Sequence, residues 1–215
     1  PVMYFTVFNK DTDGGIVITA SHNPAQYNGM KLMLGKQSFY GDAIAALAKI
    51  VEQEIPDTQN IKETGGTHIK TEIKPNYIQR ILQDLDVPDT DAKIAWDCGN
   101  GATGEVVSEL IKEMPGTHYL INETINGHFP NHHPDPSKQE NLEQLIAIVK
   151  EKNCDFGIAF DGDGDRIGVV DETGKMIHND SLIALYAKDI LTRHPEATII
   201  GDVKCGKELF QEIRD

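Results

Sequence analysis

The stretch FGIAF-DGDGDR-IGVV, residues 156–170, decides the fold. Its two flanks are short, apolar and rich in β-branched or aromatic residues, which predicts a strand on each side. Between them, Asp161, Asp163 and Asp165 alternate with glycines that keep the backbone flexible, and Arg166 closes the loop. Carboxylates this close resist joint ionisation unless a cation neutralises them. The stretch therefore predicts two strands joined by a loop that binds a divalent metal.

Three interpretations of the acidic loop compete. An EF-hand takes ligands from positions 1, 3, 5 and 12, and Glu172 does fall twelfth from Asp161, but Arg166 stands where that motif needs glycine and the predicted flanks are strands. An acidic surface turn is common for one Asp-Gly pair but not for three acids between buried strands. A Mg²⁺ site with an incomplete protein shell, open to phosphate oxygens, fits the pattern best.

Composition and charge narrow the classes of function. With 215 residues the chain can bury the core of one large or two ordinary domains. Its net charge of -14 argues against a nucleic-acid or anionic-membrane partner, and no apolar run approaches the roughly 20 residues of a membrane span. Three cysteines without a C-x-x-C pair indicate a reduced, cytoplasmic setting. The chain starts at Pro1 without a signal-peptide pattern and stops in an expected helix, so we expect a piece of a longer protein.

Strand-like runs alternate with helical patterns, which predicts an α/β fold with mainly parallel or mixed sheets. Strands are expected at residues 4–8, 15–20, 29–34, 38–40, 93–98, 117–122, 156–160, 167–170, 175–177 and 198–203. Helices are expected at 42–54, after Pro75, at 105–114, 139–152, from 180 or 181 to 193, and from 207. Pro56 and Pro88 end two of these helices, and the polar segment 57–66 is a candidate domain boundary.

A second polar segment, Thr-Ala-Ser-His-Asn-Pro at residues 19–24, follows the strand expected at 15–20. Ser21 is thus an exposed hydroxyl at the end of a rigid element. Spacing alone favours an ordinary Ser-Asn-Pro turn, and the G-x-S-x-G nucleophile elbow is absent. Lys31 follows a turn at 27–29 that can fold it back beside Ser21. A serine beside a cation suits phosphate better than an acyl group.

Segments 19–24 and 27–31 together resemble the active-site serine segment of the α-D-phosphohexomutase family, and residues 161–166 resemble its metal loop. Asp-Cys-Gly-Asn-Gly at 97–101 and Phe-Pro-Asn-His-His-Pro-Asp-Pro at 129–136 resemble its second domain, and Asp-Val-Lys-Cys at 202–205 resembles the start of its third. These later stretches point to the bacterial phosphomannomutase/phosphoglucomutase branch. The resemblance covers nearly the whole chain in the right order.

The resemblance implies a fragment of a four-domain protein whose first three domains are three-layer α/β/α sandwiches. Residues 1–70 would be the later part of domain 1 with the phosphoserine loop, 71–173 domain 2 with the metal-binding loop, and 174–215 the beginning of domain 3. An arginine-bearing segment before Pro1 would be missing, as would the sugar-reading loop and the phosphate-binding fourth domain after Asp215. The fragment alone is therefore expected to be inactive.

The implied reaction transfers a phosphoryl group between O6 and O1 of a hexose phosphate, of mannose or glucose, through a hexose 1,6-bisphosphate. Ser21 would carry the phosphoryl group, and one of its phosphate oxygens would be a further ligand of a Mg²⁺ held by Asp161, Asp163 and Asp165. The other candidate site residues are His22 and Lys31 for proton transfer or charge stabilisation, Arg166 for a bidentate phosphate contact, and Lys204 for substrate binding.

Other functions stay open. One is phosphoglucosamine mutase activity within the same family, and another is a module that binds metal or phosphosugar without turnover. A nucleotide-binding dehydrogenase is a third, because Gly99, Gly101 and Gly104 fit G-x-G-x-x-G before an expected helix and Glu123 could supply its acid.

The adjacent histidines His132 and His133 look like a zinc pair. Neighbouring histidines point apart, however, and no Cys/His partner set is evident. We interpret them as part of the loop structure.

Overall fold

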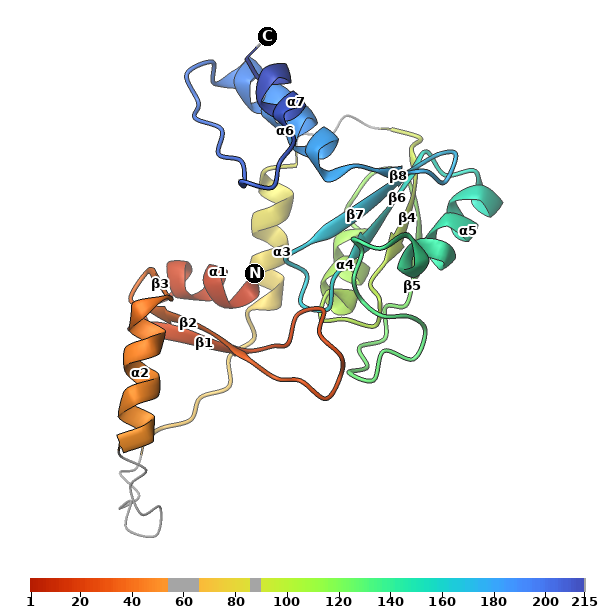
Figure 1. The fold of residues 1–215 in the computed structure, drawn as a ribbon. Helices are drawn as coiled ribbons and strands as arrows, with labels where there is room; N and C mark the ends of the chain where they lie inside the picture. Colours follow the sequence, from red (N-terminus) through yellow and green to blue (C-terminus); the bar gives the residue numbers. More distant parts are fainter. Residues whose placement is uncertain (54–65, 86–89, 215) are drawn as a thin grey trace. The chain divides into compact units, whose positions relative to one another are not determined.

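The structure, a computed structural model, describes residues 1–53, 66–85 and 90–214 (Figure 1). It divides into two compact units, Pro1–Val87 and Pro88–Asp215, and each is described by itself. Pro56, Pro88 and nearly all of the boundary segment predicted at 57–66 lie outside the described residues. The domain limits expected near residues 70 and 173 stay a prediction.

The first unit contains a three-stranded antiparallel sheet in the order β1 (Gly14–Ile18), β2 (Met30–Leu34), β3 (Gln37–Phe39). Its helices are α1 (Val2–Asn9), α2 (Asp42–Gln53) and α3 (Lys74–Gln83). The three strands and the last two helices confirm the sequence pattern. The polar segment 19–29 is the loop that joins β1 to β2, so Ser21 lies on a β-hairpin.

The prediction of a strand at residues 4–8 is wrong, because this segment lies in helix α1. A short apolar run does not distinguish a strand from a buried helix, and here tertiary packing decides. The helix places Met3 and Val7 one turn apart over Gly15 of β1, where a side-chain Cβ would lie 2.6 Å from the sulfur of Met3 and 2.6 Å from a methyl group of Val7. Phe5, on the same helix, packs edge-on against Tyr77 of α3 at 5.3 Å between ring centroids.

Helix α2 forms as predicted, but its apolar face is exposed within the described residues. Ile44, Leu47 and Val51 share that face and are all exposed. The sheet face of β1 and β2 that carries Ile16 and Met30 is exposed as well. Periodicity thus identified the helix correctly but not what covers it.

The second unit is built on a five-stranded mixed sheet in the order β5-β4-β6-β7-β8. Strand β4 (Lys93–Asp97) is parallel to both β5 (Thr117–Ile121) and β6 (Phe156–Phe160). Strand β7 (Ile167–Asp171) pairs antiparallel with β6, and β8 (Met176–Ile177) pairs antiparallel with β7. Helices of this unit are α4 (Gly104–Leu110), the 3₁₀ turn η2 (Gln139–Leu142), α5 (Glu143–Lys152), α6 (Asn179–Arg193) and α7 (Lys207–Glu212).

Helices cover this sheet on both faces. Alternate residues of β4 point to opposite sides: Trp96 packs with Val107 of α4, whereas Ala95 packs with Leu145 and Val149 of α5. This is the three-layer α/β/α arrangement with a mixed sheet that the sequence led us to expect. Because β4 and β6 run parallel, their carboxyl ends meet at one edge of the sheet, and the loops that leave this edge carry the polar residues considered below.

Gly104, the first residue of α4, lies against backbone. A Cβ at this position would meet the carbonyl oxygen of Glu123 at 1.8 Å. We therefore expect Gly104→Ala to lower the free energy of unfolding by about 3 kcal/mol or more, measured by urea denaturation. Gly127→Ala is the matched control, because a Cβ there meets nothing within 4 Å. Equal stability of the two variants would contradict the packing described.

The strand predicted at 198–203 is also wrong. Ile200 and Val203 have the composition of a strand but are exposed, and the segment makes no ladder within the described residues. A strand exists only through hydrogen bonds to a neighbour, so β-branched composition alone cannot create one. The helix expected from residue 207 is present as α7.

The three cysteines, Cys98, Cys154 and Cys205, are free thiols. Burial raises the pKa of Cys98 to about 12, which keeps its thiol protonated and unreactive. In the described part of the chain no helix is long and apolar enough to cross a bilayer.

Candidate metal centre and serine loop

The acidic loop joins β6 to β7 and is shaped by its first aspartate. Asp161 is completely buried. Its Oδ1 accepts hydrogen bonds from the backbone N–H groups of Asp165 at 3.0 Å and Arg166 at 3.2 Å, and its carbonyl accepts one from Gly164 at 3.1 Å. Gly164 has φ +72°, a conformation that glycine adopts without strain. One carboxylate oxygen of Asp161 therefore folds the loop back on itself.

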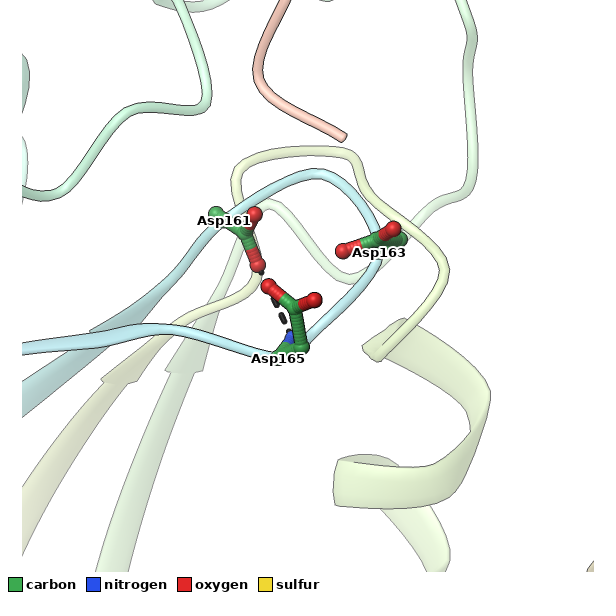
Figure 2. Close-up of side chains that lie close together, drawn as sticks. All are labelled: Asp161, Asp163 and Asp165. Atoms are coloured by element: carbon green, nitrogen blue, oxygen red, sulfur yellow. Dashed lines mark hydrogen bonds between the residues drawn. The ribbon is translucent and has the colours of Figure 1, made fainter. Parts of the chain in front are cut away.

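Three carboxylates converge in this loop (Figure 2). One oxygen each from Asp161, Asp163 and Asp165 lies within 4.8 Å of the others, so the group could hold a metal ion. Carboxylate oxygens are hard donors that suit Mg²⁺ or Ca²⁺ rather than a thiophilic metal. Three monodentate ligands fill half of an octahedral shell, which leaves positions for oxygens of another group. The donor set therefore fits the cation expected from the sequence.

The turn after β4, residues 99–103, packs against the acidic loop. The N–H of Ala102 donates to the carbonyl of Gly162 at 2.9 Å. A Cβ at Gly101 would lie only 2.8 Å from that same carbonyl, and one at Gly164 would lie 2.3 Å from a methyl group of Thr103. The turn after β4, residues 99–103, and the acidic loop thus pack backbone against backbone.

This packing bears on the dinucleotide alternative. In a nucleotide-binding turn, glycine lets the backbone approach a pyrophosphate. Here the close approach permitted at Gly101 is made to the carbonyl of Gly162. Gly101 is therefore explained by this contact, and Gly104 by its contact with the carbonyl of Glu123, which argues against a dehydrogenase.

Arg166 lies at the exit of the loop with its side chain 55% exposed. Its Nε is 3.8 Å from Oδ1 of Asp165, a long and solvent-screened ion pair. The guanidinium therefore lies beside the carboxylate cluster, where it could contact an anion.

The EF-hand alternative is wrong, because strands β6 and β7 flank the acidic loop and pair with each other. The segment after β7 forms the predicted hairpin turn, in which Oδ1 of Asp171 accepts hydrogen bonds from Thr173 and from the N–H of Lys175. The pKa of Asp171 is lowered, mainly by the hydrogen bond from the hydroxyl of Thr173. Glu172 is an exposed residue of this turn.

Ser21 lies in the hairpin loop of the first unit. The loop is closed by the N–H of Thr19, which donates to the carbonyl of Gly29 at 3.0 Å. Ser21 has φ +54°, a left-handed conformation that is uncommon for serine, and its N–H donates to the hydroxyl of Thr19 at 2.9 Å. Its Oγ is 3.2 Å from Nδ1 of His22. A strained backbone conformation at a polar loop is a feature that functional sites often show.

Lys31 lies at the base of the same loop. The antiparallel register sets Lys31 of β2 opposite Val17 of β1, one pair inside the Ile18–Met30 pair that precedes the loop. Ser21, His22 and Lys31 therefore belong to one hairpin. The turn predicted at 27–29 lies instead at residues 24–27, where the N–H of Tyr27 donates to the carbonyl of Pro24 at 2.9 Å. Asp161, Asp163, Asp165 and Arg166 belong to the second unit. Lys204 lies in an exposed turn before α7, where its N–H donates to Asp202 at 2.8 Å.

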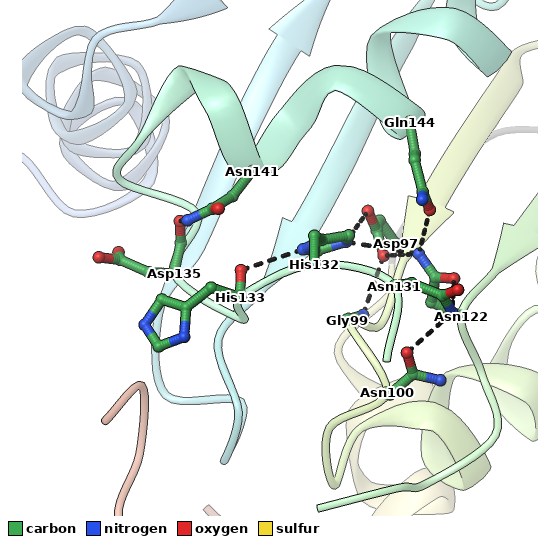
Figure 3. Close-up of polar contacts among 10 residues, drawn as sticks. All are labelled: Asp97, Gly99, Asn100, Asn122, Asn131, His132, His133, Asp135, Asn141 and Gln144. Carbon is green, nitrogen blue, oxygen red and sulfur yellow. Dashed lines mark hydrogen bonds and ion pairs between the residues drawn. The ribbon is translucent and has the colours of Figure 1, made fainter. Parts of the chain in front are cut away.

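A buried polar network that sequence reasoning missed lies at the end of β4 (Figure 3). The carboxylate of Asp97 is completely buried. Its Oδ1 accepts hydrogen bonds from the N–H of Gly99 and from Nδ2 of Asn122, both at 2.9 Å, and its Oδ2 is 2.9 Å from Nε2 of His132. The ring of His133 points elsewhere (Figure 3). The interpretation of the two histidines as loop structure is thus correct, but their sequence held no signal for the partner of His132.

The pair makes stability depend on pH. The hydrogen bond to Asp97 is the main cause that raises the pKa of His132 above its ordinary value. The stabilisation of the folded protein by protonated His132 is fully present below the unfolded-state pKa of about 6.5. It is lost as pH rises through the higher folded-state pKa. We expect the free energy of unfolding of His132→Asn to depend less on pH than that of the wild type between about pH 6 and 9. Parallel profiles, measured by urea denaturation, would contradict a protonated His132.

Comparison with known proteins gives concordant results. The domain II model of the phosphoglucomutase/phosphomannomutase family, "alpha/beta/alpha domain II", matches residues 75–174, and the domain I model matches residues 1–58. The domain II match begins in α3, whereas contacts place α3 in the first unit. The matched ranges follow shared ancestry and the contacts follow packing, so the two divisions measure different things.

Relatives at the level of whole proteins agree. A phosphomannomutase/phosphoglucomutase of Pseudomonas aeruginosa is 40% identical over 213 residues, which are 99% of this chain and 45% of the relative. A phosphoglucomutase of Neisseria meningitidis is 39% identical over 100% of this chain and 46% of its own length. The crystal structure of a phosphoglucomutase/phosphomannomutase family protein from Burkholderia thailandensis superposes with a TM-score of 0.86 at 38% identity, covering 95% of this chain and 43% of that one.

The chain thus spans less than half the length of the relatives it matches, and the two family models together match well over half of the chain. Its acidic loop and its serine hairpin each fall within one of the matched ranges. The chain belongs to the phosphoglucomutase/phosphomannomutase family and matches the α/β/α domain I and domain II models of that family.

Proposed function

We propose that the protein of which this chain is part is a Mg²⁺-dependent phosphohexomutase that moves a phosphoryl group between O6 and O1 of a mannose or glucose phosphate. The observation that carries the proposal is the convergence of Asp161, Asp163 and Asp165 within 4.8 Å in a chain of this family. The names of the relatives, phosphomannomutase and phosphoglucomutase, support these two sugars. The substrates would be the hexose phosphate and its 1,6-bisphosphate.

The three aspartates would hold Mg²⁺, which when bound offsets negative charge on the phosphoryl group. Oδ1 of the buried Asp161 accepts hydrogen bonds from the N–H groups of Asp165 and Arg166, which would hold the loop in the shape that brings the three ligands together. Arg166, beside Asp165, would contact the phosphoryl oxygens. A guanidinium can do so with two parallel hydrogen bonds.

Ser21 would carry the phosphoryl group. As a sugar hydroxyl forms its bond to phosphorus and loses its proton, the bond from phosphorus to Oγ of Ser21 breaks and Oγ takes up a proton. In the return step Oγ bonds to the phosphorus of the other phosphate, the bond from that phosphorus to the sugar oxygen breaks, and the sugar oxygen takes up a proton while Oγ must lose its own proton. Nδ1 of His22, 3.2 Å from Oγ, is placed to accept it. Lys31, at the base of the hairpin, would stabilise the negative charge, and Lys204 would bind the substrate.

The proposal assigns the phosphoryl carrier to the hairpin loop and the metal ligands to the acidic loop. It also assigns residues 1–70, 71–173 and 174–215 to the later part of domain 1, to domain 2 and to the beginning of domain 3, and it places the reaction in the cytoplasm. Because the chain covers less than half of its relatives, turnover is proposed for the longer protein. The 215 residues alone would bind the cation without turnover.

The proposed function is tested by following hexose phosphates by ³¹P NMR. With Mg²⁺ and a trace of glucose 1,6-bisphosphate, the intact protein should convert mannose 1-phosphate and glucose 1-phosphate to the 6-phosphates. Conversion of glucosamine phosphate alone would identify a phosphoglucosamine mutase. If no sugar phosphate is interconverted although the cation binds, the protein is a binding module.

A further inference from the structure

The contacts of the Asp97–His132 pair match those of an imidazolium beside a carboxylate. Nε2 of His132 faces Oδ2 of Asp97 at 2.9 Å, and Nδ1 faces the backbone carbonyl of His133 at 3.0 Å. An ionised carboxylate and a carbonyl can only accept hydrogen bonds, so both ring nitrogens must donate. His132 is therefore an imidazolium that neutralises a buried carboxylate.

A third contact does not change this assignment. Nδ2 of Asn122 lies 3.4 Å from Nε2 of His132. Both hydrogens of that amide are already used, in bonds of 2.9 Å to Oδ1 of Asp97 and to Oε1 of Gln144. Asp97 of β4 is the acidic side chain that faces the ring, and the neighbouring side chains of Asn122 and Gln144 are neutral amides (Figure 3).

The pair is connected to the acidic loop through one short turn. Asp97 binds the N–H of Gly99, which begins that turn, and both Gly99 and Asn100 have left-handed conformations, with φ of +53° and +57°. Asn131, next to His132, donates to Oδ1 of Asn100 at 2.9 Å. Three residues on from Gly99, the N–H of Ala102 donates to the carbonyl of Gly162 in the acidic loop.

We propose that the Asp97–His132 ion pair positions the metal loop: it fixes the turn 99–103, which supports residues 161–165, so that affinity for the cation depends on protonated His132. Neutral His132 would leave the carboxylate of Asp97 buried without a counter-charge and would turn a lone pair of Nδ1 toward a carbonyl. The turn would then change conformation, and the hydrogen bond from Ala102 to the carbonyl of Gly162 would be lost. His132 is a positioning residue in this proposal, which rests on the proposed metal site.

The test is calorimetric titration of the intact protein with Mg²⁺ alone, together with amide hydrogen exchange of Ala102. Replacing a residue that orients a metal ligand without binding the metal usually lowers affinity by about 10–100-fold. We expect His132→Asn to weaken Mg²⁺ binding by about tenfold at pH 6, near the lower end of that range, because the effect passes through a turn. The wild type should lose affinity as pH rises from about 6 to 9, a range in which aspartates stay ionised, and the variant should not.

Two further variants make the result specific. Asp97→Asn keeps an oxygen for Gly99 and Asn122 while it removes the charge, so it should also abolish the pH dependence even if His132→Asn folds poorly. The control His128→Asn changes an exposed histidine of the same loop and should leave Mg²⁺ affinity unchanged. Exchange of the Ala102 amide, measured without metal, should be faster in both pair variants and unchanged in the control.

The outcomes separate this inference from the proposed function. If the wild type binds Mg²⁺ and His132→Asn binds it with the same affinity and the same pH profile, the positioning role is overturned while the metal site stands. If the wild type binds no Mg²⁺, the proposed metal site is overturned, and this inference with it.

Discussion

Replacing Ser21 with alanine is expected to abolish phosphoryl transfer, with turnover of hexose 1-phosphate falling by at least about 10⁴-fold, since loss of a nucleophile costs this much or more in enzymes that form covalent intermediates. Oγ is the only atom of Ser21 that could hold the phosphoryl group, and alanine keeps the rest of the residue. The measurement is the rate of 6-phosphate formation in the intact protein.

Ser38→Ala is the matched control. Ser38 lies on β3 of the same antiparallel sheet and is exposed. Its replacement should leave turnover within about twofold, because surface substitutions away from special features change stability by about 0.5 kcal/mol or less. Full activity of Ser21→Ala would show that another residue carries the phosphoryl group.

Replacing Asp163 with asparagine is expected to weaken Mg²⁺ binding by about 100-fold or more, with a similar loss of turnover at limiting Mg²⁺, because the loss of a ligand should cost at least as much as the about 10–100-fold effect of changing a residue that only orients one. The substitution preserves shape but removes one of three converging charges. Binding can be followed by the fluorescence of Trp96, the only tryptophan of the chain. Its ring stacks on Phe160, the residue before Asp161, at 6.3 Å between centroids.

The control for Asp163 is Glu172→Gln. Glu172 is the acid that an EF-hand would use as its twelfth ligand, but here it lies exposed on the turn after β7. Its replacement should not alter the midpoint of the Mg²⁺ titration. If Glu172→Gln shifted the titration midpoint to higher Mg²⁺ concentration while Asp163→Asn left it unchanged, residues other than the three aspartates would bind the cation.

The acidic loop could be predicted from the sequence because all of its determinants are local. Its two strands are adjacent along the chain, its glycines fix the turn, and its three ligands alternate in one short loop between them. The same holds for the serine hairpin, whose strands β1 and β2 pair with each other. Where partners are close in sequence, pattern and turn chemistry were sufficient.

Predictions failed where packing or pairing with another segment decides the structure. Residues 4–8 became a helix because Met3 and Val7 pack over Gly15, and residues 198–203 made no strand because a strand needs a neighbour. His132 lies 35 residues from Asp97, so only the fold shows that they form a pair. The sequence of the polar loop contains two histidines but does not indicate that either pairs with Asp97. Asp97 itself was part of a segment, residues 97–101, that carries the family resemblance.

The central claim is that Ser21 carries the phosphoryl group, and the most direct test is the intact mass of the protein after incubation with glucose 1,6-bisphosphate and Mg²⁺. We predict a mass increase of one phosphoryl group, located on the peptide with Ser21, absent from Ser21→Ala and much reduced in Asp163→Asn. A wild-type protein that turns over hexose phosphate with no phosphoryl adduct, or with the adduct on another residue, would contradict the account.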